Sequence, residues 1–509
     1  MHVVYRLVVA RHNVILSHRR RMRFRQRFRD LLIVIPGIGG SELYDGDRPI
    51  FKPMTHTLRR VAVEGTRALD QLAADPAALD DPERERNVHA PRLIGLPVSL
   101  PGLAKVNQYR TLRESLHDAF ELTDGSVTEP GPLANYFEFP YDWRRDIRMP
   151  AAQLADFVNR ELPRWRSHLS GAPAKTVIVA HSMGGLVARH YLESLDGARD
   201  CRALFTYGTP YRGSLAALGV LASGLRLGDI AVPNVAEVLR RFTSVHQLLP
   251  RFPAIWDHRS ANVPTRPTRI SDLGPRVGDL DTRRAVEALN GLHDPPDTGS
   301  LADWGVRWVP VVGYGHPTLL SATLDRRGLR TGTAPIRRDE SDPWRDSGDR
   351  TVPAFSALPV GRDGKPEPSV RYFPVNQTHS TVHCRPASVN QLVMELSHLS
   401  GSLSDPDLQT DPTHPATDRP TGAFEPSIGI DLADSTEPGE PVVLHCTVPP
   451  GFERRLLNVR LDPPAATATA TVAHDDAGFT WTADGLPAGT YEVLVDVDGH
   501  SAADIVEVG

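Results

Sequence analysis

Short, continuous runs of apolar residues recur along the first 400 residues of the chain, separated by helical or polar stretches. Such a run, bounded by turn residues, is typical of a strand buried on both faces of a parallel sheet. We predict strands at Leu31–Pro36, Thr176–Ala180, Leu204–Tyr207, Val306–Val312 and Val370–Pro374. Amphipathic patterns predict helices at Tyr109–Phe120, Ala151–Leu169 and directly after residue 182. Strands that alternate with helices indicate an α/β fold with a parallel sheet.

Two long segments interrupt this alternation. Residues Tyr211–Asp303 combine helical segments with many Pro and Arg residues, whereas His316–Ser347 is polar and predicted to be a loop. Segments of this length inside a compact domain are usually functional covers or disordered. We therefore regard the insertion 211–303 as a candidate lid.

The pattern changes near residue 401. Residues Ser402–Gly422 are rich in Asp, Pro, Thr and Ser, which is linker composition. Beyond them, about seven short alternating runs separated by Pro/Gly turns predict a small Ig-like β-sandwich. The predicted organisation is an arm over 1–30, an α/β domain over 31–400, a linker over 401–422 and an all-β module over 423–509.

The composition of the chain limits the classes of partner and cofactor that can be expected. The net charge of −5 over 509 residues favours no polyanionic partner for the whole chain, so no nucleic acid is predicted. The three cysteines form no disulfide framework and no metal-type spacing, and neither a metal nor another cofactor is predicted. This sparse set fits a reducing compartment.

The N-terminus is basic. Arg6 and Arg11 interrupt its apolar part and the positive run Arg19–Arg29 follows, which is the reverse of a secretory signal. No stretch reaches the roughly 18–20 apolar residues of a membrane span. We therefore predict a cytoplasmic protein with a solvated arm. Contact of this arm with anionic lipid headgroups, as a peripheral membrane association, is the alternative.

The segment Ala180-His181-Ser182-Met183-Gly184 has the pattern of a nucleophile elbow, with Ala in place of the first Gly. Small residues two before and two after the serine allow a sharp strand-to-helix turn that exposes its hydroxyl group. The flanks fit, because TVIVA precedes the turn and a helical pattern follows it. We predict that Ser182 is the nucleophile of an acyl-transfer enzyme on an α/β-hydrolase sheet.

A serine hydroxyl group needs a histidine base, and the histidine needs an acid that orients it. In this fold the acid and then the histidine follow the serine along the chain. Asp349 in SGDRTVP is the preferred acid, with Asp346 as its rival. His379, just after the run VRYFP, is the preferred base, with His383 as its rival.

Two backbone amides are predicted to stabilise the oxyanion. The amide of Met183 would lie at a helix N-terminus, where partial positive charge favours a developing anion. The second donor normally comes from the loop after an early strand, which here is the glycine-rich segment 36–41. Ile38 is the residue predicted to donate it, and a plain glycine turn is the alternative.

These residues resemble the lecithin:cholesterol acyltransferase family, which also includes lysosomal phospholipase A2 and phospholipid:diacylglycerol acyltransferases. The resemblance spans Leu31–Leu399. It rests on LLIVIPGIGGSEL, on PYDWR at Pro140–Arg144, on AHSMGG followed by GTPYRGS, and on GDRTVP with His379 beyond it. The sequence departs from the family where its second acidic residue is replaced by Arg350, and it lacks the cysteine pair of the animal enzymes' membrane-binding loop.

The resemblance implies an acyl-enzyme mechanism in which Ser182 attacks a lipid ester and the acyl group passes to water or to an alcohol. It also implies that Tyr141–Arg144 stabilises the core instead of reacting. A soluble carboxylesterase acting on a non-lipid ester is the competing function. A non-enzymatic scaffold, whose β module binds a protein or glycan partner, is a third hypothesis.

Overall fold

The computed structural model describes residues 3–5, 25–52, 72, 88–100, 102–129, 131–169, 173–227, 230–232, 235–259, 266–293, 301–336, 346–361, 367, 370–404, 427–437, 439–449, 457–465, 468–475 and 477–508. Most of the predicted arm over 1–30 and of the predicted linker over 401–422 lies outside the described residues. These two predictions are therefore untested there.

A parallel sheet forms the centre of the first domain. In the described part of the chain its strand order is β10 (Asp124–Gly125), β11 (Tyr136–Glu138), β3 (Leu31–Ile35), β12 (Thr176–His181), β13 (Cys201–Tyr207), β19 (Arg307–Gly313) and β22 (Phe373–Val375). All neighbouring pairs run parallel. Every residue of β3 and β12 is buried, as expected for strands covered on both faces.

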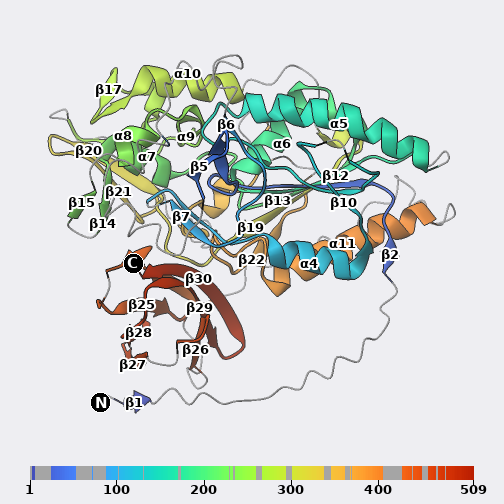
Figure 1. Ribbon diagram of the computed structural model, residues 1–509. Helices are drawn as coiled ribbons and strands as arrows, with labels where there is room; N and C mark the ends of the chain where they lie inside the picture. Colours follow the sequence, from blue (N-terminus) through green and yellow to red (C-terminus); the bar gives the residue numbers. More distant parts are fainter. Residues whose placement is uncertain are drawn as a thin grey trace.

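Helices cover both faces of this sheet (Figure 1). α5 (Arg148–His168) and α6 (Met183–Ser194) lie on one face, and α4 (Arg110–Ala119) and α11 (Pro386–Ser404) lie on the other. Their apolar stripes face the strands; in α4, for example, Leu112 and Leu116 are buried. This three-layer arrangement confirms the predicted α/β-hydrolase fold.

The strand order reverses between β3 and β12. The chain leaves β3 for β11 on one side, then returns to β12 on the other side and continues toward β22. In open α/β sheets, ligands bind at such a reversal, outside the carboxyl ends of the strands. Ile35 pairs with Ala180, so the glycine-rich loop after β3 and the elbow after β12 emerge side by side.

The insertion 211–303 packs on the same hydrophobic core. It contributes α7 (Leu215–Ser223), α8 (Val235–Leu239), α9 (Thr243–Gln247) and α10 (Thr282–His293), with the short strands β14 (Leu225–Leu227), β15 (Ile230–Val232), β16 (Ile255–Asp257), β17 (Arg276–Val277) and β18 (Leu280–Asp281). Apolar residues of α7, including Leu215, Leu218 and Leu221, are buried in that core. The insertion therefore forms a packed layer of helices and short strands at one end of the sheet (Figure 1).

The prediction of a loop over His316–Ser347 is wrong for residues 321–332. They form an antiparallel hairpin of β20 (Ser321–Asp325) and β21 (Gly328–Gly332), and β20 also pairs with β16. Ala322, Leu324 and Leu329 are buried, so a two-residue alternation was present but concealed by the charged turn. Gly328 has a φ of 114°, a conformation that favours glycine at this turn.

Several short strands of the first domain form small sheets separate from the central one. β2 (Gln26–Arg27) pairs with β9 (Phe120–Glu121), and β4 (Leu43–Asp45) lies between β5 (Arg48–Phe51) and β6 (Val88–His89). β7 (Val98–Leu100) and β8 (Ala104–Val106) form a hairpin directly before α4.

The C-terminal region is all-β, as predicted. Among the described residues, β1 (Val3–Tyr5), β27 (Thr469–His474), β28 (Gly478–Asp484), β25 (Val442–Thr447) and β23 (Gly429–Leu432) form one sheet in that order. A second sheet has the order β24 (Ser435–Thr436), β30 (His500–Val508), β29 (Gly489–Val497) and β26 (Leu457–Asp462). The module has its own core, which includes Trp481, and β30 faces the first domain (Figure 1).

Candidate active site

Ser182 lies at the turn between β12 and α6. Its backbone has φ 52° and ψ −125°, a conformation that costs free energy for a residue with a Cβ atom. The turn is held because the Ser182 amide donates to the Tyr207 carbonyl at 2.8 Å. A Cβ at Gly184 would lie 2.4 Å from the Pro36 carbonyl oxygen, so only glycine lets α6 approach the end of β3 this closely.

The structure brings His379 and Ser182 together across 197 residues of sequence. His379 lies in the loop after β22, and its Nε2 is 2.8 Å from the Ser182 Oγ. Its Nδ1 is 2.8 Å from the Asp349 Oδ2. Because the carboxylate can only accept, Nδ1 carries the proton and Nε2 is free to accept the serine proton.

Asp349 is fixed by backbone groups on both sides. Its Oδ1 accepts from the amides of Thr351 at 3.0 Å and Val352 at 2.6 Å. Its carbonyl accepts from the His379 amide at 2.7 Å. These contacts place Asp349, and not its rival Asp346, on the histidine.

His383 does not contact the serine. Its ring stacks on His181 at 4.4 Å and on Tyr109 at 4.6 Å between centroids, in a fully buried cluster. Burial lowers the pKa of His383 to about 3, and the neighbouring His379 adds to this effect. His383 is therefore a neutral packing partner of the site in the folded chain.

The predicted oxyanion residues flank the serine. Met183 is the first residue of α6, and the loop that contains Ile38 runs past the elbow. A Cβ at Gly37 would lie 2.8 Å from the Ser182 Cβ, so the backbone of this loop touches the nucleophile. Ile38 and Met183 are both buried.

The loop of residues 36–41 is held by the PYDWR segment. The Tyr141 hydroxyl group donates to the Pro36 carbonyl at 2.9 Å, and the Trp143 indole donates to the Ser41 carbonyl at 3.1 Å. The Ser41 hydroxyl group accepts from the Tyr141 amide. The segment is buried and does not reach Ser182 through any of these contacts. Its role is to fix the loop.

A polar relay, which the sequence analysis missed, connects this loop to His379. The Gly37 amide donates to the Tyr109 hydroxyl oxygen at 3.0 Å, and that hydroxyl group donates to Nδ1 of His181 at 3.0 Å. Nε2 of His181 then donates to the His379 carbonyl at 3.0 Å. Burial, together with His383 and His379, lowers the pKa of His181 well below its usual value, so the ring is neutral.

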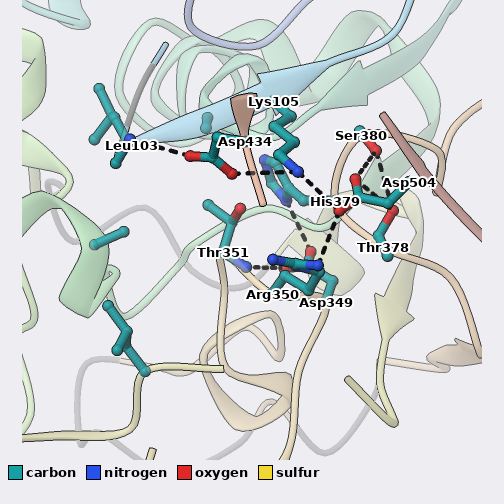
Figure 2. Close-up of a pocket in the computed structure, with 14 residues that line it drawn as sticks. Leu103, Lys105, Asp349, Arg350, Thr351, Thr378, His379, Ser380, Asp434 and Asp504 are labelled. Atoms are coloured by element: carbon teal, nitrogen blue, oxygen red, sulfur yellow. Dashed lines mark hydrogen bonds and ion pairs between the residues drawn. The ribbon is translucent and has the colours of Figure 1, made fainter. Parts of the chain in front are cut away.

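A cavity of about 160 Å³ opens beside Asp349 and His379 (Figure 2). Its lining is mostly polar and comes from three parts of the chain. Lys105 follows the hairpin turn of β7 and β8, Asp349 and His379 come from loops of the first domain, and Asp434 and Asp504 come from the C-terminal module. Within the described ranges, no group of three or more His, Cys, Asp or Glu side chains is placed to hold a metal ion.

A sequence model of the family described as lecithin:cholesterol acyltransferase matches residues 128–272. This segment is similar to that family. The lecithin:cholesterol acyltransferase match contains PYDWR, the elbow and GTPYRGS, and it confirms the predicted resemblance over these residues. It ends before Asp349 and His379. No curated protein matches the chain significantly.

Solved structures with similar folds include a lipase, BlEst2, from Bacillus licheniformis. Its mature form is 10% identical with a TM-score of 0.32, covering 73% of this chain and 92% of that chain. Phospholipase PlaB from Legionella pneumophila is 10% identical with a TM-score of 0.28, covering 93% and 89%. Among the described residues, no helix is long and apolar enough to cross a membrane.

Proposed function

We propose that this protein is a serine-dependent lipid acyl hydrolase or O-acyltransferase that forms an acyl-enzyme on Ser182. The observation that carries the proposal is the buried hydrogen-bonded series of Asp349, His379 and Ser182, at the point where the strand order reverses. The lecithin:cholesterol acyltransferase match supports the reaction class. The names of the similar lipase and phospholipase agree with a lipid ester as substrate.

In the first step, Nε2 of His379 takes the proton of Ser182 while Oγ attacks the ester carbonyl carbon. Asp349 stabilises the resulting imidazolium. The amides of Ile38 and Met183 are proposed to donate to the oxyanion. The tetrahedral intermediate then collapses, the bond to the alcohol oxygen breaks, and His379 gives its proton to that oxygen.

In the second step, water or an acceptor alcohol enters. His379 removes its proton, and its oxygen attacks the acyl carbon of the Ser182 ester. Collapse of the second intermediate returns the proton to Ser182 and releases a fatty acid or a new ester. The chemistry of Ser182 is the same in both cases, so the acceptor decides between hydrolase and transferase.

The lining of the cavity favours a second candidate, a carboxylesterase for a soluble ester. Lys105, Arg350, Asp434 and Asp504 make the space beside His379 polar, which suits a hydrophilic group better than an acyl chain. Under this alternative, vesicle-bound esters would be poor substrates and water-soluble esters good ones.

Vesicles of acyl-labelled phospholipid, with and without an added long-chain alcohol, test these proposals. We expect release of labelled fatty acid, transfer to the alcohol, or both. Ser182→Ala should lose at least about 10³-fold in rate. Ser126→Ala, which changes an exposed serine, is the matched control and should keep the activity.

An unchanged rate for Ser182→Ala would overturn the acyl-enzyme. Turnover of a soluble chromogenic ester that depends on Ser182, without any turnover of vesicles, would replace the lipid ester with the soluble one. Sedimentation of the protein with the same vesicles tests the predicted peripheral membrane contact. The predicted cytoplasmic location and the predicted partner of the β module stay predictions.

A further inference from the structure

A carboxylate of the C-terminal module lies beside the proposed active site. Asp504, in the middle of β30, is almost fully buried against the first domain (Figure 2). Its Oδ2 is 3.0 Å from the Lys105 ammonium group and 3.1 Å from the Arg350 guanidinium group. Its Oδ1 accepts from the Ser380 hydroxyl group at 2.9 Å.

The partners of Asp504 adjoin both members of the proposed acid–base pair in sequence. Arg350 follows Asp349 directly, and Ser380 follows His379 directly. On the other side of His379, the Thr378 hydroxyl group donates to the carbonyl of Ala503, the neighbour of Asp504, at 2.6 Å. One segment of β30 therefore contacts both loops at the residues next to Asp349 and His379.

Arg350 has an unfavourable backbone conformation, and both domains contact this residue. Its φ is 79°, which lies in the left-handed region that is unfavourable for a residue with a side chain. In the first domain, the Arg350 amide donates to the Thr318 hydroxyl oxygen at 2.9 Å. The module holds the side chain, because the guanidinium group donates to the Leu432 carbonyl at 2.7 Å and pairs with Asp504 and Asp431. Arg350 is also the position where the sequence departs from the family pattern, and the module lies outside the resemblance.

The charges of Asp504, Lys105 and Arg350 stabilise one another in this buried position. A carboxylate buried this deeply is stable only with paired charges and satisfied hydrogen bonds. Burial alone would raise the pKa of Asp504, but Lys105 and Arg350 outweigh it and hold the pKa below its usual value. Loss of the carboxylate would leave Lys105 and Arg350 paired only with Asp434 and Asp431, which are more exposed than Asp504.

We propose that Asp504 is a positioning residue, through which the β-sandwich fixes the two loops that carry Asp349 and His379. The active site is then assembled from both domains, and the module is a working part of the enzyme. This inference rests on the proposed function of Ser182 and its partners. Asp504 acts through Arg350, Ser380 and Lys105 and does not touch the serine.

The test compares Asp504→Asn with Glu492→Gln in the full-length protein. Glu492 also joins the domains, through Arg385 at 3.3 Å, with both side chains mostly buried, but it contacts neither loop residue next to Asp349 nor one next to His379. Three quantities are measured for each variant: kcat and KM on a short-chain chromogenic ester, the rate of Ser182 labelling by a fluorophosphonate, and the melting temperature.

For Asp504→Asn we expect kcat and the labelling rate to fall together by about 10–100-fold, because small displacements of reacting groups have effects of this size. KM should change by less than about threefold, since a positioning residue acts on the reacting groups and not on bound substrate. Glu492→Gln should keep kcat and the labelling rate within about twofold, even if its melting temperature falls as far as that of Asp504→Asn.

Equal rates for Asp504→Asn and the wild type would overturn the proposal, and so would equal losses in both variants, which would mean that domain docking alone matters. If Asp504→Asn does not fold, Ser380→Ala removes one contact of Asp504 and should lower kcat by about 3–10-fold, the value of one hydrogen bond. Labelling that survives Ser182→Ala would refute the proposed function instead, independently of Asp504.

Discussion

The hydroxyl group of Tyr109 lies 3.0 Å from Nδ1 of His181, and this contact joins the loop after β3 to the loop after β22. Tyr109 accepts from the amide of Gly37, and His181 donates to the carbonyl of His379. The direction of every donor is consistent with a neutral imidazole, which burial enforces. The relay thus ties the proposed oxyanion loop to the proposed base.

Tyr109→Phe should therefore lower kcat by about tenfold, because one buried hydrogen bond is worth about 1 kcal/mol and its partners lose a contact. The ring still stacks on His383, so the chain should fold, but the unpaired Gly37 amide and His181 Nδ1 should lower its melting temperature. Steady-state kinetics on a soluble ester measure the effect. Tyr136→Phe, a buried tyrosine on β11 that bonds Glu138 at 3.4 Å, is the control and should retain full activity. Equal activity of the two variants would contradict the relay.

Gly208 tests how tightly the acid and the base are packed. A Cβ at this position would lie 2.7 Å from the Asp349 Oδ2 and 3.0 Å from the His379 Nδ1. Gly208→Ala should separate the pair and lower kcat by about 10²-fold or more, since a misplacement near 1 Å has that effect. The rate on a soluble ester and the melting temperature are both measured.

The control must share the backbone cost of that substitution. Gly208 has φ 55° and Gly305 has φ 72°, so alanine is strained at both, but a Cβ at Gly305 meets nothing within 4 Å. Gly305→Ala should lose about 1–2 kcal/mol of stability and keep its kcat. A normal kcat for Gly208→Ala would show that the Asp349–His379 contact tolerates displacement.

The sequence predicted the strands around the elbow because β3, β12 and residues 203–207 of β13 are buried and mostly apolar, whereas Arg202 hid the start of β13. It also predicted Ser182, Asp349 and His379, since the order of these groups along the chain follows from the fold. Their joint catalytic role remains a proposal. The hairpin of residues 321–332 was missed because Arg326, Arg327 and the glycines hide its alternation.

Other features depend on contacts between distant segments, which no local pattern reveals. Tyr109 and His181 have no motif of their own, and their relay exists only once α4 is packed under the sheet. Asp504 did leave a signal, because it stands inside the otherwise apolar run of Ala502–Val506 in a strand whose residues are all buried from 502 to 508. A lone acid in such a run indicates a buried ion pair, but not the identity of its partners.

The PYDWR segment contains an ion pair whose burial can be tested against an exposed copy. Asp142 and Arg144 form two hydrogen bonds, at 2.9 and 2.7 Å, with Arg144 fully buried. Asp257 and Arg259 form the same pair at 2.9 and 2.7 Å, with the arginine side chain 40% exposed. Geometry and sequence spacing are shared, so burial is the variable.

Asp142→Asn should destabilise the protein by about 3–5 kcal/mol, because it removes a carboxylate that is paired with a buried guanidinium group. Asp257→Asn should cost at most about 1 kcal/mol, as is usual for exposed pairs. Melting temperatures of the two variants measure the difference. Equal shifts would mean that water reaches Arg144 or that Leu72, whose carbonyl accepts from it at 3.1 Å, compensates for the loss.

Buried neutral histidines make stability depend on pH. Burial lowers the pKa of His246 to about 4 and that of His316 and His383 to about 3, from an ordinary value of 6.5. The unfolded chain therefore binds protons below about pH 6.5 that the folded chain does not bind, and each such histidine costs about 1.4 kcal/mol per pH unit. Above that pH these histidines do not reduce the free energy of unfolding. As the pH falls toward their pKa values in the folded chain, the free energy of unfolding decreases.

The melting temperature should thus be constant from pH 8 to about pH 7 and fall progressively below about pH 6.5. His383→Phe keeps an aromatic ring against Tyr109 and His181 but cannot bind a proton, so its melting temperature should fall less steeply between pH 6.5 and 4.5 than that of the wild type. His474→Gln changes an exposed side chain of the β module and should follow the wild-type profile. If the profile of His383→Phe were as steep as that of the wild type, His383 of the wild type would already be protonated in the folded protein. Its buried position between two other rings makes that state electrostatically costly.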